Sequence, residues 1–183
     1  MELSKNVMAP LDLLTERYPV LSGCRESILG AYEILEKCYA SGGKLLVAGN
    51  GGSAADAEHI VGELMKSFVL PRKLPAEYGK CLCNVDAELG EILQNNLQGA
   101  MPAIALDGHL SLSTAYMNDC EPLLCFAQQV NGYGAAGDVF MGISTSGNSK
   151  NVMFAAVTST VYAASAVMPV NWAAFSVTVT VSS

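Results

Sequence analysis

Two short runs of small and polar residues carry groups suited to binding an anion. The first, Gly49-Asn50-Gly51-Gly52-Ser53, follows an apolar run and precedes a segment with helical spacing. Its glycines let the backbone approach a ligand closely, and the free N–H groups at a helix start favour negative charge. The second, Ser144-Thr145-Ser146-Gly147-Asn148-Ser149, places four hydroxyls and an amide after another apolar run. Together the two runs predict a phosphosugar pocket.

His59 and Glu63 are the residues best placed for proton transfer. They are four positions apart, so on a helix they share one face. A carboxylate near an anion site is a suitable base, because burial would raise its pKa toward a useful range. The same spacing also fits an ordinary amphipathic helix with a His–Glu hydrogen bond. The other histidine, His109, follows an expected strand, where either a loop role or a pocket role is open.

The glycine run does not match the common nucleotide-binding motifs. No further glycine opens the helix after Gly52, so G-x-G-x-x-G is absent, and G-x-x-x-x-G-K-[ST] does not occur. These absences disfavour a nucleoside triphosphatase.

Strands that alternate with helices must position these residues. Helical spacing or composition predicts helices over about 10–18, 22–40, 54–68, 86–98, 112–117 and 122–133, and one from about 150. Ser53 is the expected N-cap of the helix at 54, with Asp56 completing an approximate capping box. Buried strands are expected at 44–49, 102–107 and 138–143, and period-two alternation predicts a strand at 175–181. This order predicts an α/β fold with a parallel sheet, whose ligands lie beyond the strand carboxyl ends.

Bulk composition narrows the possible partners. The chain has 183 residues and a formal charge of −7, so a broad basic surface for nucleic acid is not expected. Six scattered cysteines without a C-x-x-C pair, and no signal peptide at the start, predict reduced thiols in a cytoplasmic protein. The apolar region 152–170 is rich in Ser, Thr and Ala and contains Pro169, so no membrane helix is expected.

The two runs, together with three further stretches, resemble the sugar isomerase (SIS) domain, and more closely the phosphoheptose isomerase family. The additional matching stretches are Ala54 to His59, Glu63-Leu64 and Asn118-Asp119, and the second run extends from Gly142 to Val152. The resemblance covers roughly residues 5–157. It implies a single SIS domain over 1–183, with N-terminal helices in about 1–41, a family-like core in about 42–157 and an atypical tail in about 158–183.

The resemblance also implies a fold, an assembly and a reaction. The fold is a three-layer α/β/α sandwich on a mainly parallel sheet of about five strands, and the assembly is a homotetramer or dimer with pockets between subunits. The reaction is the keto–aldo isomerisation of sedoheptulose 7-phosphate through an enediol. No direct nucleic-acid or membrane partner is implied.

Site residues follow from the same resemblance. The resemblance implies phosphate contacts at Ser53, Ser144, Thr145, Ser146 and Ser149. Gly51 and Gly52 are also expected to bind the substrate. Asn50 and Asp119 are the expected sugar contacts. Glu63 is the expected base, and His59 and Glu63 are the counterparts of zinc ligands in some members. No cofactor is expected to be required, because two protein ligands fall short of the three or four usual for zinc.

The chain departs from the family after about residue 158. It lacks the Thr-Gly turn and the final helix whose Gln and His complete the acid and zinc functions, and no histidine follows His109. The general acid is therefore unassigned, and impaired catalysis is expected. A truncated or frame-shifted product and a true short variant both fit. The alternatives to an isomerase are a non-catalytic SIS protein that binds a sugar phosphate or the replication initiator DnaA, and a sugar-phosphate-sensing regulatory domain.

Overall fold

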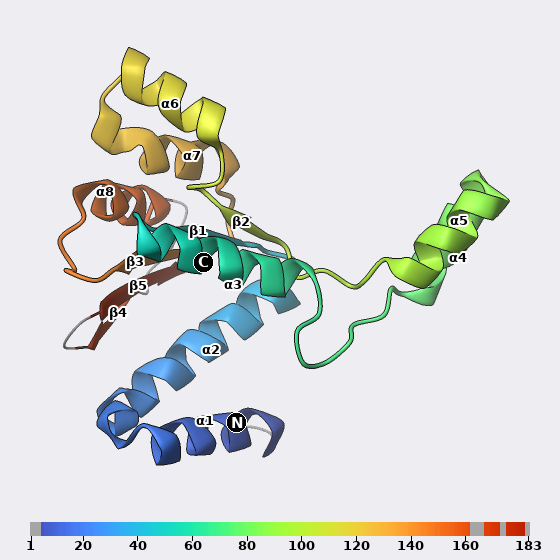
Figure 1. Ribbon diagram of the computed structural model, residues 1–183, viewed down its shortest axis with the longest axis horizontal. Coiled ribbons are helices and arrows are strands. Elements are labelled where there is room, and N and C mark those ends of the chain that lie inside the picture. Colours follow the sequence, from blue (N-terminus) through green and yellow to red (C-terminus); the bar gives the residue numbers. More distant parts are fainter. Residues whose placement is uncertain (1–4, 162–166, 173–174, 182–183) are drawn as a thin grey trace.

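A five-stranded sheet with helices on both faces forms the body of the protein (Figure 1). The computed structural model describes residues 5–161, 167–172 and 175–181, with side chains for 6–161. The strands are β1 (Leu45–Ala48), β2 (Ala103–Ala105), β3 (Val139–Ser144), β4 (Val167–Trp172) and β5 (Phe175–Val181), in the spatial order β2-β1-β3-β5-β4. β2, β1 and β3 are parallel to one another, which confirms the expected α/β class.

The last two strands complete the sheet in a mixed arrangement. The alternating segment at 175–181 does form a strand, but β5 runs antiparallel to both β3 and β4. Four of the five strands therefore share one direction, and β5 alone is reversed.

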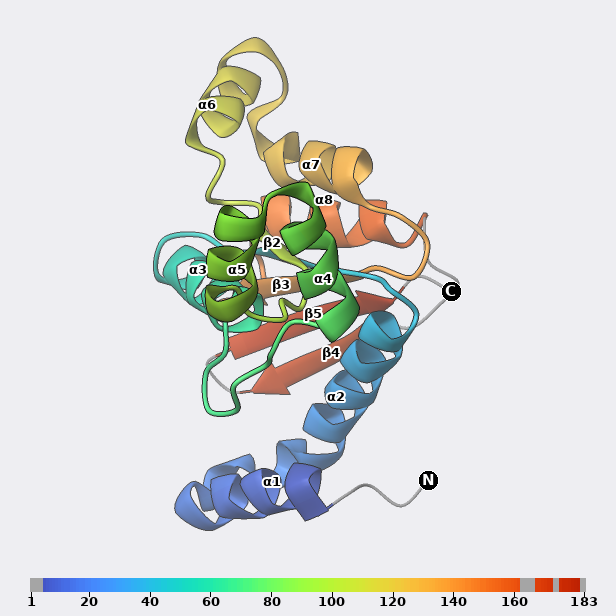
Figure 2. The same ribbon diagram turned by 90° about the vertical axis from the view of Figure 1, so that its right-hand side faces the viewer.

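Alternate residues of the central strands face opposite layers. Leu45 and Val47 of β1 pack against α2 (Arg25–Ala40) and α3 (Gly52–Met65), in a cluster that includes Ile34, Ile60 and Leu64. On the other face, Leu46 and Phe140 pack against α7 (Cys125–Tyr133) and α8 (Lys150–Ser159). These two helices contribute Phe126, Val130, Val152 and Ala155 to this second cluster. These two clusters establish the predicted three-layer sandwich (Figure 2).

The two N-terminal helices end close to where the spacing predicts, but they begin at other residues. α1 (Lys5–Arg17) starts earlier than expected and contains Pro10, and a 3₁₀ turn, η1 (Pro19–Cys24), occupies the start of the second predicted helix. α2 ends before the Gly42-Gly43 pair, as predicted.

The predicted start of α3 was wrong by two residues. Ser53 lies inside the helix and does not cap it; Gly51 is the N-cap, and no side chain caps this end. The reason is the left-handed backbone of Gly51 (φ 58°), which turns the chain directly from β1 into the helix.

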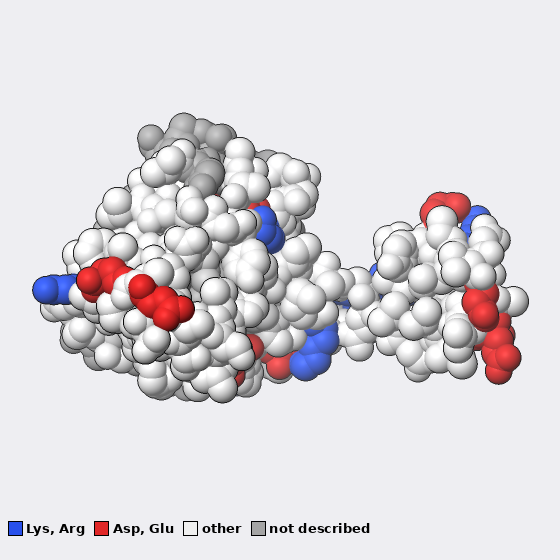
Figure 3. Space-filling view, turned by 90° about the horizontal axis from the view of Figure 1, so that it is seen from above, with Lys and Arg blue, Asp and Glu red and all other residues white. Residues whose placement is uncertain are grey.

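A helical hairpin, the arm, projects from the body on a narrow neck (Figures 1 and 3). It consists of α4 (Ala76–Val85) and α5 (Ala87–Asn96). α5 was predicted and starts at the Asp86 N-cap, whose side chain accepts from the Leu89 N–H, whereas α4 was missed. Acidic side chains gather over the outer part of the arm (Figure 3). Arg72 ties the neck to the body by donating to the carbonyls of Leu64, Lys66 and Gly99 at 2.6–2.8 Å.

The segment between β2 and β3 is helical, as expected. α6 (Leu110–Asp119) leads through the 3₁₀ turn η2 (Pro122–Leu124) into α7. None of the helices in the described ranges is long and apolar enough to cross a membrane. All six cysteines are free thiols, although only Cys38 and Cys125 are buried.

Candidate functional site

The two polar runs meet at one edge of the sheet. β1 and β3 are adjacent parallel strands with Ala48 opposite Gly142, so the turns that follow them emerge side by side. A reciprocal amide pair then links the turns: Asn50 Nδ2 donates to Asn151 Oδ1 at 3.0 Å, and Asn151 Nδ2 donates to Asn50 Oδ1 at 2.8 Å. The predicted meeting of the two runs beyond the strand ends is therefore confirmed.

The first turn has the features of an anion-binding helix start. A side chain at Gly49 would collide with the backbone of Ser53, so glycine is required for the turn to close this tightly. Ser53 N–H donates to Asn50 O at 3.1 Å and Ala54 N–H donates to Gly51 O at 3.1 Å. The N–H groups of Gly51 and Gly52 have no backbone acceptor among the described residues, which leaves them available at the positive end of α3.

The second turn holds its hydroxyls at different depths. Ser144 is buried at the end of β3, and its Oγ lies 2.9 Å from the Oγ of Ser149 at the N-cap of α8. Thr145 and Ser146 are exposed, and Ser146 Oγ accepts from the Asn148 N–H at 3.2 Å. This turn therefore presents two hydroxyls outward at a second helix start.

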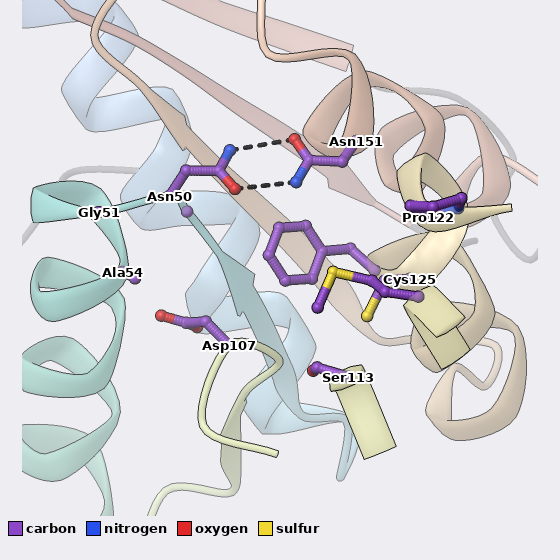
Figure 4. Close-up of a pocket in the computed structure, with 11 residues that line it drawn as sticks. Asn50, Gly51, Ala54, Asp107, Ser113, Pro122, Cys125 and Asn151 are labelled. Carbon is purple, nitrogen blue, oxygen red and sulfur yellow. Dashed lines mark hydrogen bonds between the residues drawn. The ribbon is translucent and has the colours of Figure 1, made fainter. Parts of the chain in front are cut away.

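A cavity of about 250 Å³ opens beside the first turn (Figure 4). The polar groups of its lining come from the first turn, the start of α8, the loop after β2 and α6, and the apolar groups come from α3, α6, η2 and α7. Its lining residues are Gly49, Asn50, Gly51, Ala54, Asp107, Ser113, Met117, Pro122, Cys125, Phe126 and Asn151. Of the predicted contacts, Asn50 and Gly51 line this cavity, whereas Gly52, Ser53 and the hydroxyls of the second turn lie outside its lining.

Asp107 is an ionisable residue of the cavity lining that was not among the predicted site residues. It follows β2 directly, and its side chain projects toward α3 in Figure 4. Both of its carboxylate oxygens are shielded from solvent and have no hydrogen-bond partner among the described residues. Burial raises the pKa of Asp107 to about 6, and the negative charge of Glu58 adds to this, while the nearby backbone N–H group of Asp107 and the charge of His109 lower it. A carboxylate placed directly after a buried strand was the available signal.

Two further polar groups without a hydrogen-bond partner lie between β2 and the middle of α6. Ser113 Oγ and His109 Nε2 are buried without a partner in the described part of the chain. Ser113 lines the cavity, while the His109 ring packs against Tyr133 with centroids 5.6 Å apart. His109 is therefore not among the residues that line the cavity, and its ring packs on Tyr133.

His59 and Glu63 share a face of α3 but lie away from the cavity. Glu63 is eleven residues after the start of the helix at Gly52, which corresponds to about 16 Å along the axis. Lys66 Nζ donates to both Glu63 oxygens, at 2.9 and 2.8 Å, and His59 Nε2 is 3.7 Å from Glu63 Oε1. The His59 side chain is 76% exposed and the Glu63 side chain 26%.

These two residues do not make a zinc site by themselves. Within the described ranges, no group of three or more His, Cys, Asp or Glu side chains is placed to hold a metal ion. The Lys66 ammonium group already occupies both Glu63 oxygens, and a cation there opposes a second cation.

Asp119 lies at the exposed end of α6, outside the cavity lining. Its Oδ1 accepts a hydrogen bond from the neighbouring Asn118 Nδ2 at 2.8 Å. Its assignment as a sugar contact stays a prediction.

A layered α/β sandwich with two linked polar turns at adjacent strand ends defines the class as a sugar isomerase fold. Solved structures support this class. A phosphoheptose isomerase from Neisseria gonorrhoeae matches with a TM-score of 0.54 and 31% identity, over 82% of this chain and 61% of that one. One from Francisella tularensis matches with a TM-score of 0.54 and 26% identity, over 82% and 62%.

Curated relatives carry the same name as these two solved proteins. The phosphoheptose isomerase of Citrifermentans bemidjiense is 38% identical over 154 residues, or 84% of this chain and 65% of the relative. No model of a known protein family matches the chain. The chain thus spans less than two thirds of the relatives it matches, and its resemblance to phosphoheptose isomerases is confirmed over that part.

Proposed function

We propose that this protein binds a heptose phosphate and acts as a phosphoheptose isomerase, with sedoheptulose 7-phosphate as substrate. One observation carries the proposal: the Asn50–Asn151 amide pair joins two helix-starting turns at adjacent strand ends. Free Gly51 and Gly52 amides on one side and the Thr145 and Ser146 hydroxyls on the other suit a phosphate dianion without a lysine. The neighbouring cavity would take the sugar.

The proposed reaction moves protons within the substrate and needs no redox partner. A base removes a proton from C1 of the ketose and returns it to C2, while the O1 proton moves to O2, so the carbonyl shifts from C2 to C1 through an enediol. In this proposal Glu63 is the base and His59 assists it, as the family resemblance implies. The substrate would have to reach Glu63 from the phosphate end of α3.

A binding role without turnover is the second candidate. The observations that favour it are the distance of Glu63 from the cavity and the two hydrogen bonds that Lys66 makes to its carboxylate. Such a protein would respond to a sugar phosphate or engage a protein partner such as the replication initiator DnaA.

An isomerase assay separates the two candidates. The full chain is incubated with sedoheptulose 7-phosphate, and formation of the aldose phosphate is followed by NMR. The proposal predicts turnover that falls at least about a hundredfold in Glu63→Gln, with Glu33→Gln, on exposed α2 surface, as the matched control. Binding of the sugar phosphate without turnover in the unmodified chain supports the second candidate.

The proposal also covers the cellular compartment, the assembly and the cofactor requirement of the protein. We place it in the cytoplasm as a homo-oligomer, a tetramer or a dimer, without a required cofactor and without a nucleic-acid partner. The six free thiols fit a reducing compartment. Light scattering after size exclusion would report the assembly, and a monomeric mass would contradict it.

A further inference from the structure

Two residues that line the cavity carry buried polar atoms without a hydrogen-bond partner among the described residues. Asp107 has two partnerless oxygens and Ser113 has one, and both residues line the cavity. Buried polar groups in folded proteins are nearly always hydrogen-bonded, and an unmet one costs free energy. Two such residues beside one cavity indicate a missing set of donors.

The chemistry of these atoms indicates what the donors are. A carboxylate accepts hydrogen bonds only, and a serine hydroxyl both donates and accepts. Met117, Pro122 and Phe126 in the same lining offer apolar surface. A ligand that carries both adjacent hydroxyls and C–H groups matches this mixed lining, and this is the character of a polyol chain.

The position of the cavity connects it to the phosphate-binding turns. Asn50 and Gly51 belong both to the first turn and to the cavity lining, and Asn151 links them to the second turn. A ligand whose phosphate sits at the turns therefore extends its carbon chain past Asp107. The carboxylate oxygens are shielded from solvent and project toward α3, so the proposed contact requires the Asp107 side chain to rotate toward the cavity.

We propose that Asp107 and Ser113 form a polyol subsite that binds the hydroxyl groups of the phosphosugar, with Asp107 accepting hydrogen bonds from two of them. This inference rests on the proposed function for the identity of the ligand. It assigns sugar recognition to the loop after β2 and the first turns of α6, in addition to the predicted contacts Asn50 and Asp119.

The charges around Asp107 support this role. Glu58 on α3 disfavours its ionised form, and His109 on its own loop favours it. Hydroxyl donors from a ligand would stabilise the carboxylate, so ligand binding and ionisation of Asp107 should favour each other.

The test measures binding of sedoheptulose 7-phosphate by calorimetry at pH 7.5, with inorganic phosphate as a second probe. Asp107→Asn should weaken the binding of sedoheptulose 7-phosphate about ten- to a hundredfold and leave the binding of inorganic phosphate unchanged. Ser113→Ala should weaken the sugar phosphate less, while Ser111→Ala, exposed on the same helix, should have no effect. At pH 5, where Asp107 is mostly protonated, the difference between the unmodified chain and Asp107→Asn should shrink.

The outcomes separate this inference from the proposed function. Equal affinity of Asp107→Asn and the unmodified chain for sedoheptulose 7-phosphate overturns the subsite, whether or not the chain has isomerase activity. A selective loss in Asp107→Asn supports the subsite even if the unmodified chain shows no turnover. Binding of inorganic phosphate without any binding of sedoheptulose 7-phosphate overturns both.

Discussion

Asp107 is expected to make the stability of the protein depend on pH. Its pKa of about 6 lies above its ordinary value of 3.8, so the folded state holds this proton more tightly than the unfolded state. The free energy of unfolding should therefore fall as the pH rises from about 4 to about 6, and change little above that. Asp107→Asn should remove this fall.

The measurement is urea denaturation at pH 4.5, 5.5 and 7 for both chains. Relative to the unmodified chain, Asp107→Asn should gain stability as the pH increases. A constant difference between the two chains across this range would contradict the expectation, because it would mean that Asp107 titrates equally in the folded and unfolded states.

Tyr39 carries another buried polar atom, but in a different setting. Its hydroxyl group has no partner in the described part of the chain, and burial raises the pKa of Tyr39 to about 12. The ring packs against the core cluster between α2 and the sheet, away from the cavity lining. A ligand role is therefore not proposed for it.

Tyr39→Phe should keep or raise stability, by up to about 1 kcal/mol, because it removes an unmet polar group without changing the packing. Denaturation at pH 7 measures the change, and Tyr18→Phe, at a 57% exposed side chain, is the control expected to show none. A loss of more than about 1 kcal/mol would show that the Tyr39 hydroxyl has a hydrogen-bond partner in solution.

In the arm, α4 and α5 approach each other closely at Gly90. A Cβ added at Gly90 of α5 would come within 2.5 Å of the Cys83 Cα and N atoms on α4, whereas one added at Gly132 of α7 would meet nothing within 4 Å. Gly90→Ala should push the two helices apart and destabilise the arm by about 1–3 kcal/mol. Gly132→Ala should be neutral or stabilising by about 0.5–1 kcal/mol.

Hydrogen exchange read by mass spectrometry distinguishes these effects by location. Amides of residues 76–96 should exchange faster in Gly90→Ala, with those of β1 and β3 unchanged. Unchanged exchange in the arm would mean that α4 and α5 do not pack in this way in solution.

Elements with strong local patterns were predictable from the sequence, and their relations in space were not. Apolar runs bounded by small residues located β1 and β3 and the turns after them. α4 was missed because it lies in a proline-bearing stretch, although its apolar residues do follow helical spacing. The direction of β5 was not predictable, since period-two alternation is the same in parallel and antiparallel strands.

Site residues within one continuous motif were predictable, and those brought together by the fold were not. Asn50 and Gly51 were found because they belong to a motif that is continuous in sequence. Asp107 and Asn151 are separated from Asn50 by 57 and 101 positions in the sequence. Their place beside Asn50 therefore depends on how the loops meet in space. The cavity itself is built from six segments, and local spacing carries no information about its shape.

At the scale of the whole molecule, ligand binding should stabilise the body more than the arm. The turns and the cavity connect β1, β2 and β3 to α3, α6, α7 and α8, whereas α4 and α5 pack mainly on each other. A phosphosugar would therefore add contacts across both layers of the sandwich. The arm would keep its own local stability.

Thermal denaturation with sedoheptulose 7-phosphate tests this expectation. At about a hundred times the dissociation constant, a ligand that binds only the folded state adds about 2.7 kcal/mol, which corresponds to a rise in Tm of roughly 5–10 °C for a chain of this size. Sedoheptulose without phosphate should give a much smaller rise at the same concentration, because it lacks the group that the two turns bind. Asn151→Ala should reduce the rise by separating the turns, and a full rise in that variant would show that the amide pair does not organise the site.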